Sequence, residues 1–103
     1  FIDSLIHRRL GVSIVFDVSN SLGGNIIING TQQSLPYTED YWVNDNIQIS
    51  ANISSGWLFS YWYSINNVLL PNNLGTTANF SANQSDSIIL ILYQLEKVLV
   101  LMN

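Results

Sequence analysis

The stretch GWLFSYWY, residues 56–63, concentrates aromatic side chains that could bind a sugar. Planar rings stack on the apolar faces of pyranose sugars, and the acidic, Asn-rich remainder of the chain would supply hydrogen bonds. Tyr61, Tyr63 and Trp42 are the candidate ligand-binding residues. An aromatic ring also buries about 150–250 Å² when it packs in a core, so the same cluster is suited to hold the protein together.

The parity of this aromatic stretch separates the two uses. In a regular strand Trp62 lies on the opposite face from Trp57 and Phe59, because successive side chains alternate. A bulge just before Tyr61 shifts the parity by one residue. Trp57, Phe59 and Trp62 then all point into the core, and Tyr61 and Tyr63 are released toward solvent or a groove.

Metal binding and catalysis find less support in the residue types. Oxygen donors cluster at residues 39–46, but their spacing does not fit a twelve-residue calcium loop, and Asn and Asp in turns bond their own backbone. The single histidine, His7, is expected to be a solvated helix residue, so no serine has a positioned base. Glu39 and Asp40 are adjacent, so an extended chain directs them to opposite faces instead of toward one glycosidic bond. We therefore expect no enzyme activity, no metal site and no cofactor.

The charge distribution excludes nucleic acid as a partner. The chain has 103 residues and a net charge of −4, with no Lys or Arg between residues 11 and 94. Nucleic acids and anionic membrane surfaces are bound through cations, which this body lacks. The apolar stretch at residues 88–102 contains Gln94, Glu96 and Lys97, and it is too short and interrupted for membrane insertion. The chain has no Cys, which excludes disulfides and thiolate metal sites.

The remaining pattern predicts strands separated by Asn- and Gly-rich turns. Residues 12–18 and 25–29 are expected to form one hairpin, and residues 47–63 a second. Residues 88–93 are apolar on both faces, which predicts a central strand or a strand that is covered on both sides. The expected fold is all-β, a small antiparallel sheet or sandwich of about five to seven short strands with a short N-terminal helix. The chain divides into a helical tail of a preceding region, a β module, and a C-terminal extension or linker: residues 1–10, 11–93 and 94–103.

The residues Gly56-Trp57-x-Phe59-x-x-Trp62 resemble a signature of bacterial surface repeat domains, the divergent internalin-B-type B-repeats and their relatives. GGNIIING is similar to their first Gly-rich hairpin, YWVNDNIQISA to the run before the signature, and NFSANQSDSIILIL to their last strand. The likeness covers about residues 11–93, and it departs where Asp45-Asn46 stands in place of a common Gly. More loosely, the chain resembles the small β domain accompanying spore-coat-protein-H-like kinases, where a helical segment also precedes the hairpin.

The resemblance implies a non-catalytic accessory or spacer domain of a secreted or cell-surface bacterial protein, with a structural or interaction role. Its expected partners are neighbouring domains of the same polypeptide, and a protein or glycan at the surface. Gly56, Trp57, Phe59 and Trp62 would then be the structural signature. The alternative is a carbohydrate-binding module that uses the exposed aromatic residues. A third hypothesis is a docking domain fused to a kinase-like enzyme, with the N-terminal helix as the interface.

Overall fold

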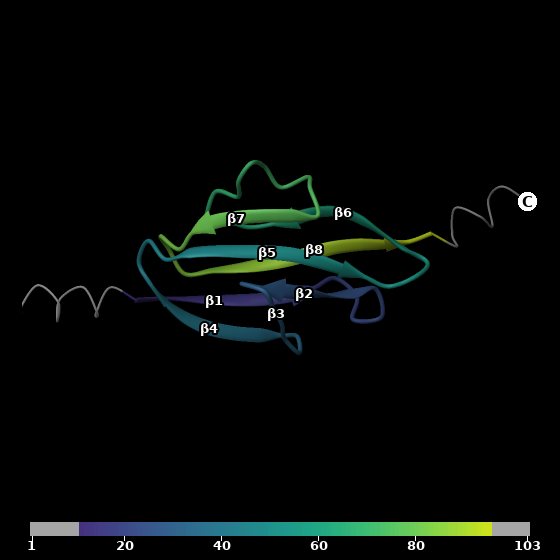
Figure 1. Ribbon diagram of the computed structural model, residues 1–103, viewed down its shortest axis with the longest axis horizontal. Coiled ribbons are helices and arrows are strands. Elements are labelled where there is room, and N and C mark those ends of the chain that lie inside the picture. The colour runs from purple at the N-terminus through teal and green to yellow at the C-terminus, as the bar shows by residue number, and fades with distance from the viewer. Residues whose placement is uncertain (1–10, 96–103) are drawn as a thin grey trace, which may run out of the picture.

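The computed structural model describes residues 11–95, which form eight β-strands and no helix. In chain order the strands are β1 (Gly11–Val18), β2 (Gly24–Ile28), β3 (Thr31–Gln32), β4 (Tyr37–Trp42), β5 (Asn46–Ile53), β6 (Trp57–Tyr63), β7 (Thr77–Ser81) and β8 (Asp86–Gln94). They make two four-stranded sheets, with the orders β4-β1-β8-β6 and β3-β2-β5-β7. The strands of both sheets run in roughly the same direction (Figure 1), which is the arrangement of an aligned sandwich. The predicted all-β class is confirmed.

Alternation of side chains along the strands places one core between the two sheets. In β1, Ile14 and Phe16 are fully buried, and each residue beside them on the strand is partly exposed. This period of two is what a strand with one covered face requires. The largest fully buried side chains come from both sheets: Trp62, Phe16, Phe80, Ile14, Ile26, Ile47, Ile49, Ile88 and Leu90.

Strand β8 lies in the interior of its sheet, between β1 and β6, as its two apolar faces predict. It pairs in parallel with β1 and in antiparallel with β6, and every other pair of neighbouring strands is antiparallel. Ile88, Leu90 and Leu92 face the core, whereas Ile89 and Ile91 are half-buried on the outer face. The apolar outer row therefore belongs to a sheet face that the described residues leave partly open.

Both predicted hairpins are wrong. Strands β1 and β2 belong to different sheets, and so do β5 and β6. In each case the short connection carries the chain from one sheet to the other, so the two strands face each other across the core. The alternating pattern specifies which side chains are buried, and this requirement is met equally well by a strand in the same sheet and by one in the facing sheet. The described residues form eight strands, more than the five to seven expected, because the two-residue strand β3 is too short to leave an alternating pattern in the sequence.

The predicted helix at residues 1–10 lies outside the described residues, as does nearly all of the predicted extension at residues 94–103.

Candidate functional site

The bulge predicted in the aromatic strand is present in β6. The register between β6 and β8 shifts between Phe59 and Tyr61, so one extra residue is accommodated there. Trp62 is consequently fully buried, and its indole N–H donates a hydrogen bond to the carbonyl of Gly75 at 2.8 Å. Trp57 and Phe59 are half-buried and pack against the same core, with the Phe59 and Trp62 ring centroids 6.0 Å apart. The tryptophans and the phenylalanine of this strand thus hold the sandwich together.

Gly56 fulfils a conformational role at the start of this strand. Its φ of +87° lies in the left-handed region that favours glycine, which lets the chain turn into β6. Its carbonyl oxygen also accepts a hydrogen bond from the backbone N–H of Leu95 at 2.8 Å. The four signature residues therefore all serve the turn or the packing of β6.

The bulge turns Tyr61 and Tyr63 outward, where they are 37% and 45% exposed. Across the antiparallel register, Tyr61 pairs with Ile91 and Tyr63 with Ile89 on β8, and Leu58 pairs with Tyr93. Tyr93 is itself 48% exposed. These outward side chains form one surface of aromatic and aliphatic groups, which we call the tyrosine face: Leu58, Tyr61, Tyr63, Ile89, Ile91 and Tyr93.

Trp42 does not join the tyrosine face. It is exposed on the outer side of β4 and pairs with Gly11, whereas Tyr63 pairs with Ile89, which lies beside Asp17. The offset between Gly11 and Asp17 corresponds to roughly 20 Å along the strands, and the three steps from β4 to β6 add roughly 14 Å across them. The structure therefore brings Tyr61 and Tyr63 together with Tyr93, a residue that sequence reasoning did not select.

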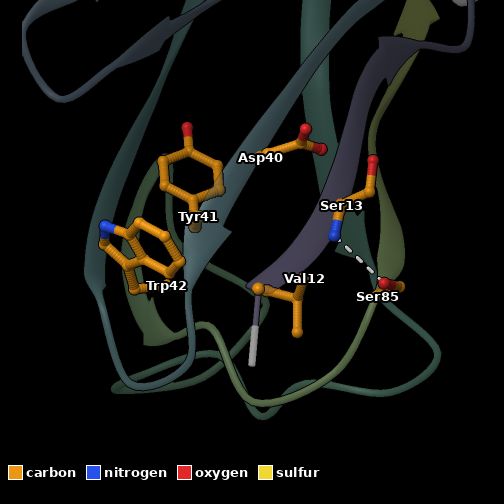
Figure 2. Close-up of a pocket in the computed structure, with 7 residues that line it drawn as sticks. Val12, Ser13, Asp40, Tyr41, Trp42 and Ser85 are labelled. Carbon is orange, nitrogen blue, oxygen red and sulfur yellow. Dashed lines mark hydrogen bonds between the residues drawn. The ribbon is translucent and has the colours of Figure 1, made fainter. Parts of the chain in front are cut away.

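Trp42 instead borders a hollow of about 440 Å³ at the end of the sheet where β1 begins. Figure 2 shows Trp42 and Asp40 on β4, Ser13 on β1, and Ser85 on the segment that leads into β8. The backbone N–H of Ser13 donates a hydrogen bond to Ser85 Oγ at 3.0 Å. The hollow thus combines the Trp42 indole, the Asp40 carboxylate and two serine hydroxyl groups, a set of groups that can contact a polyhydroxylated ligand.

The acidic residues near the β4–β5 turn do not converge. Asp40 is exposed on the outer face, and Glu39 is half-buried on the inner side, where its Oε1 accepts a hydrogen bond from the Tyr37 hydroxyl at 2.5 Å. This hydrogen bond raises the pKa of Tyr37. Asp45 Oδ2 accepts the backbone N–H of Trp42 at 3.0 Å and thereby closes the turn. Within residues 11–95 no three His, Cys, Asp or Glu side chains lie close enough to hold a metal ion.

Tyr41 carries the one buried side-chain polar atom of residues 11–95 that has no hydrogen-bond partner there, its hydroxyl oxygen. The ring packs edge-on against Phe16 with centroids 6.5 Å apart, and the residue is 8% exposed. Burial, with a smaller contribution from the neighbouring Glu39 carboxylate, raises the pKa of Tyr41 far above its usual range. The Tyr41 hydroxyl therefore stays protonated, and its oxygen is buried.

Asp86 and Asn67 form a buried polar centre that the sequence analysis did not predict. The Asp86 carboxylate accepts hydrogen bonds from the Ser64 hydroxyl at 2.6 Å, from the backbone N–H groups of residues 65–67 at 3.0–3.1 Å, and from the Asn67 side-chain amide at 3.1 Å. The Asn67 side chain also donates to the carbonyl of Gln84 at 2.9 Å and accepts from the backbone N–H of Asn83 at 3.0 Å. Two loops that are far apart in the sequence are thereby fixed to each other.

The electrostatics of this centre are determined by its hydrogen bonds. Burial by itself raises the pKa of the Asp86 carboxyl, but the hydrogen bonds from Ser64, Ile65, Asn66 and Asn67 outweigh it, and the net shift is downward. Asp86 is therefore an ionised carboxylate whose oxygens are already occupied by donors. Its chemistry is that of a loop anchor, and the only sequence signal for it is an Asp that directly precedes an apolar strand.

Comparison with known proteins returns no relative. No protein-family model, no curated protein and no solved structure matches the chain. Among the residues that the structure describes, no helix is long and apolar enough to cross a membrane. Residues 11–95 form an eight-stranded β-sandwich with an aromatic outer face.

Proposed function

We propose that this chain is a non-catalytic accessory or spacer domain of a secreted or cell-surface bacterial protein. The observation that carries the proposal is the parallel pairing of the first and last strands, which places the start of β1 and the end of β8 at opposite ends of the sandwich (Figure 1). Gly11 lies three positions before the pair Ile14–Asp86, and Gln94 lies eight positions after it, which separates them by about 36 Å. The domain therefore keeps the two flanking parts of a polypeptide apart.

The chemical groups of the sandwich support a non-catalytic role. Residues 11–95 contain no His, Lys, Arg or Cys, so they offer no imidazole, amine, guanidinium or thiol group. The carboxylates of Glu39 and Asp40 point to opposite sides of β4, and that of Asp86 is saturated by donors. A reaction that needs a paired acid and base finds no such pair among these carboxylates. The bacterial surface location rests on the resemblance of the Gly56–Trp62 signature.

Domain replacement tests the spacer role. In the polypeptide that carries this domain, residues 11–95 are exchanged either for an unrelated β-sandwich with a similar distance between its ends or for a flexible Gly/Ser linker. A spacer requires only length and stiffness, so the unrelated sandwich should restore function and the flexible linker should not. Loss of function with both replacements would overturn the spacer role and point to a specific partner.

The tyrosine face favours a second candidate function, carbohydrate binding. Tyr61, Tyr63 and Tyr93 lie on one outer sheet face, each with more than a third of its surface exposed, and aliphatic residues fill the spaces between them. Rings presented on a sheet face can stack on a polysaccharide chain that lies across it. The docking hypothesis that uses residues 1–10 concerns a segment outside the described residues and stays a prediction.

A further inference from the structure

Strands β1 and β8 are paired so that pulling on the two ends of the domain would slide one strand along the other, an arrangement that we call a mechanical clamp. Five residue pairs align the two strands in parallel, from Ile14–Asp86 to Val18–Leu90. The two strands are neighbours in the middle of their sheet, with β4 beyond β1 and β6 beyond β8. The start of β1 and the end of β8 therefore lie at opposite ends of the sheet (Figure 1).

Two serine hydroxyls extend this pairing at its ends. Beyond the C-terminal end of β1, Ser19 Oγ accepts a hydrogen bond from the backbone N–H of Leu92 at 2.9 Å and donates to the Leu92 carbonyl at 3.4 Å. The backbone N–H of Ser19 donates to the carbonyl of Leu90 at 2.8 Å. At the other end, Ser85 Oγ accepts the backbone N–H of Ser13 at 3.0 Å. The side chains thus continue the ladder where backbone pairing stops.

The core resists sliding of the same two strands. Ile14 and Phe16 on β1, and Ile88 and Leu90 on β8, are fully buried. To move one strand along the other, these side chains must leave close-packed positions while the ladder of hydrogen bonds breaks. Hydrogen bonds loaded along the strands share the force and fail together, whereas bonds at the end of a hairpin pulled apart fail one after another.

We infer that the β1–β8 contact is a clamp that makes the domain resist stretching between its N- and C-terminal ends. A force transmitted by the flanking chain loads β1 and β8 in shear. The use of this resistance in a surface protein rests on the spacer role proposed above, but the resistance itself is a property of the fold. In that role the neighbouring domains of the same polypeptide would apply the force.

Single-molecule pulling with two attachment geometries tests the inference. Both use a handle at the N-terminus of the full chain, and the second handle is either at the C-terminus or at a cysteine introduced by Trp42→Cys, which is unique because the chain has no Cys. Trp42 pairs with Gly11 in an antiparallel register, so the second geometry peels β4 from β1 pair by pair. We expect the end-to-end geometry to require the higher force and to release the chain in one step. An equal or lower force end to end overturns the clamp.

Asp40→Cys, which lies opposite Ser13, gives a second peeling geometry if the Trp42 variant does not fold. Ser19→Ala should lower the end-to-end unfolding force and leave the peeling force unchanged, because Ser19 bonds to β8 and not to β4. Ser55→Ala is the matched control, since Ser55 is exposed in the turn before β6 and no hydrogen bond of its side chain occurs within residues 11–95. Equal end-to-end forces for the two serine variants would remove Ser19 from the clamp. A domain that withstands force but fails the domain-replacement test keeps the clamp and loses the spacer role.

Discussion

Gly23 lies directly against the indole ring of Trp57. A Cβ atom at position 23 would be 2.7 Å from Trp57 Cε3 and 2.9 Å from Leu92 Cδ1, both closer than side chains normally approach. Gly23 is buried in the connection that crosses from β1 to β2 in the facing sheet, and Trp57 is the first residue of β6, which belongs to the same sheet as β1. Because Gly23 has no side chain, the connection between β1 and β2 can pass directly against the Trp57 ring.

Gly23→Ala is expected to lower the free energy of unfolding by about 1–3 kcal/mol, because the added methyl group forces Trp57 and Leu92 out of their packed positions. Chemical denaturation monitored by tryptophan fluorescence measures this loss. Gly75→Ala is the matched control, since its Cβ would meet only the Thr77 carbonyl oxygen, at an ordinary 3.6 Å. The control should change stability by about 0.5 kcal/mol or less. Equal effects of the two substitutions would contradict the packing role of Gly23.

The positions and buried faces of β1 and β8 were predictable because they depend on local periodicity, whereas residues 29–40 were expected to form a loop and contain β3 and most of β4. The alternation at residues 12–18 and 88–93 gives the inward rows of β1 and β8 as the structure has them. The bulge in β6 was predictable for the same reason, since no regular strand buries Trp62 together with Trp57 and Phe59. These conclusions require only the chemistry of neighbouring residues.

Strand partners were not predictable, because pairing is decided by contacts between distant segments. The same side chains of β1 and β2 are buried whether the two strands share a sheet or lie in facing sheets, so the hydrophobic pattern cannot distinguish the two arrangements. Tyr93 was not predicted as a binding residue, because only the register of β6 with β8 places it on the same face as Tyr61 and Tyr63. The anchor role of Asp86 depends likewise on Asn67, which reaches it from another loop.

Asp86→Asn is expected to lower the free energy of unfolding by about 2–4 kcal/mol. Both oxygens of the Asp86 carboxylate face hydrogen-bond donors, so an Asn side chain would place its own NH₂ donor against some of them. Urea denaturation measures the loss, and amide hydrogen exchange in residues 64–70 should rise with it. Asp40→Asn makes the same chemical change at an exposed position and should alter stability by about 0.5 kcal/mol or less. A stable Asp86→Asn variant with unchanged exchange would show that the carboxylate does not anchor the loops.

Acid should destabilise the domain through the same residue. The pKa of Asp86 is lower in the folded state than its ordinary value, so the unfolded chain binds the proton more readily. The resulting stabilisation is fully present above the ordinary Asp value of about 3.9 and is lost as the pH falls from there through the folded pKa. Unfolding free energies measured near neutral pH and below about pH 4 should therefore differ less in Asp86→Asn than in Asp40→Asn. An identical difference in both variants would assign the acid sensitivity to other carboxylates.

Sedimentation with insoluble polysaccharides tests the tyrosine face. If the face binds such a chain, Tyr61→Ala and Tyr63→Ala should each weaken binding roughly tenfold, which corresponds to about 1.4 kcal/mol. Tyr93→Ala should have a similar effect, because Tyr93 belongs to the same outer surface. Tyr61→Phe retains the ring and should retain most of the affinity.

Trp42→Ala distinguishes binding at the tyrosine face from binding at the hollow beside Trp42. Trp42 lies at the opposite edge of the sheet from β6, so its loss should not change binding to the tyrosine face. If Trp42→Ala alone abolishes binding, the ligand occupies the hollow bordered by Asp40, Ser13 and Ser85 instead. If the unaltered domain sediments with no polysaccharide, the carbohydrate-binding alternative is excluded for the ligands tested. In that case the next use of the exposed rings to test is a protein contact, in which a spacer domain packs against its neighbours through the outer face of β6 and β8.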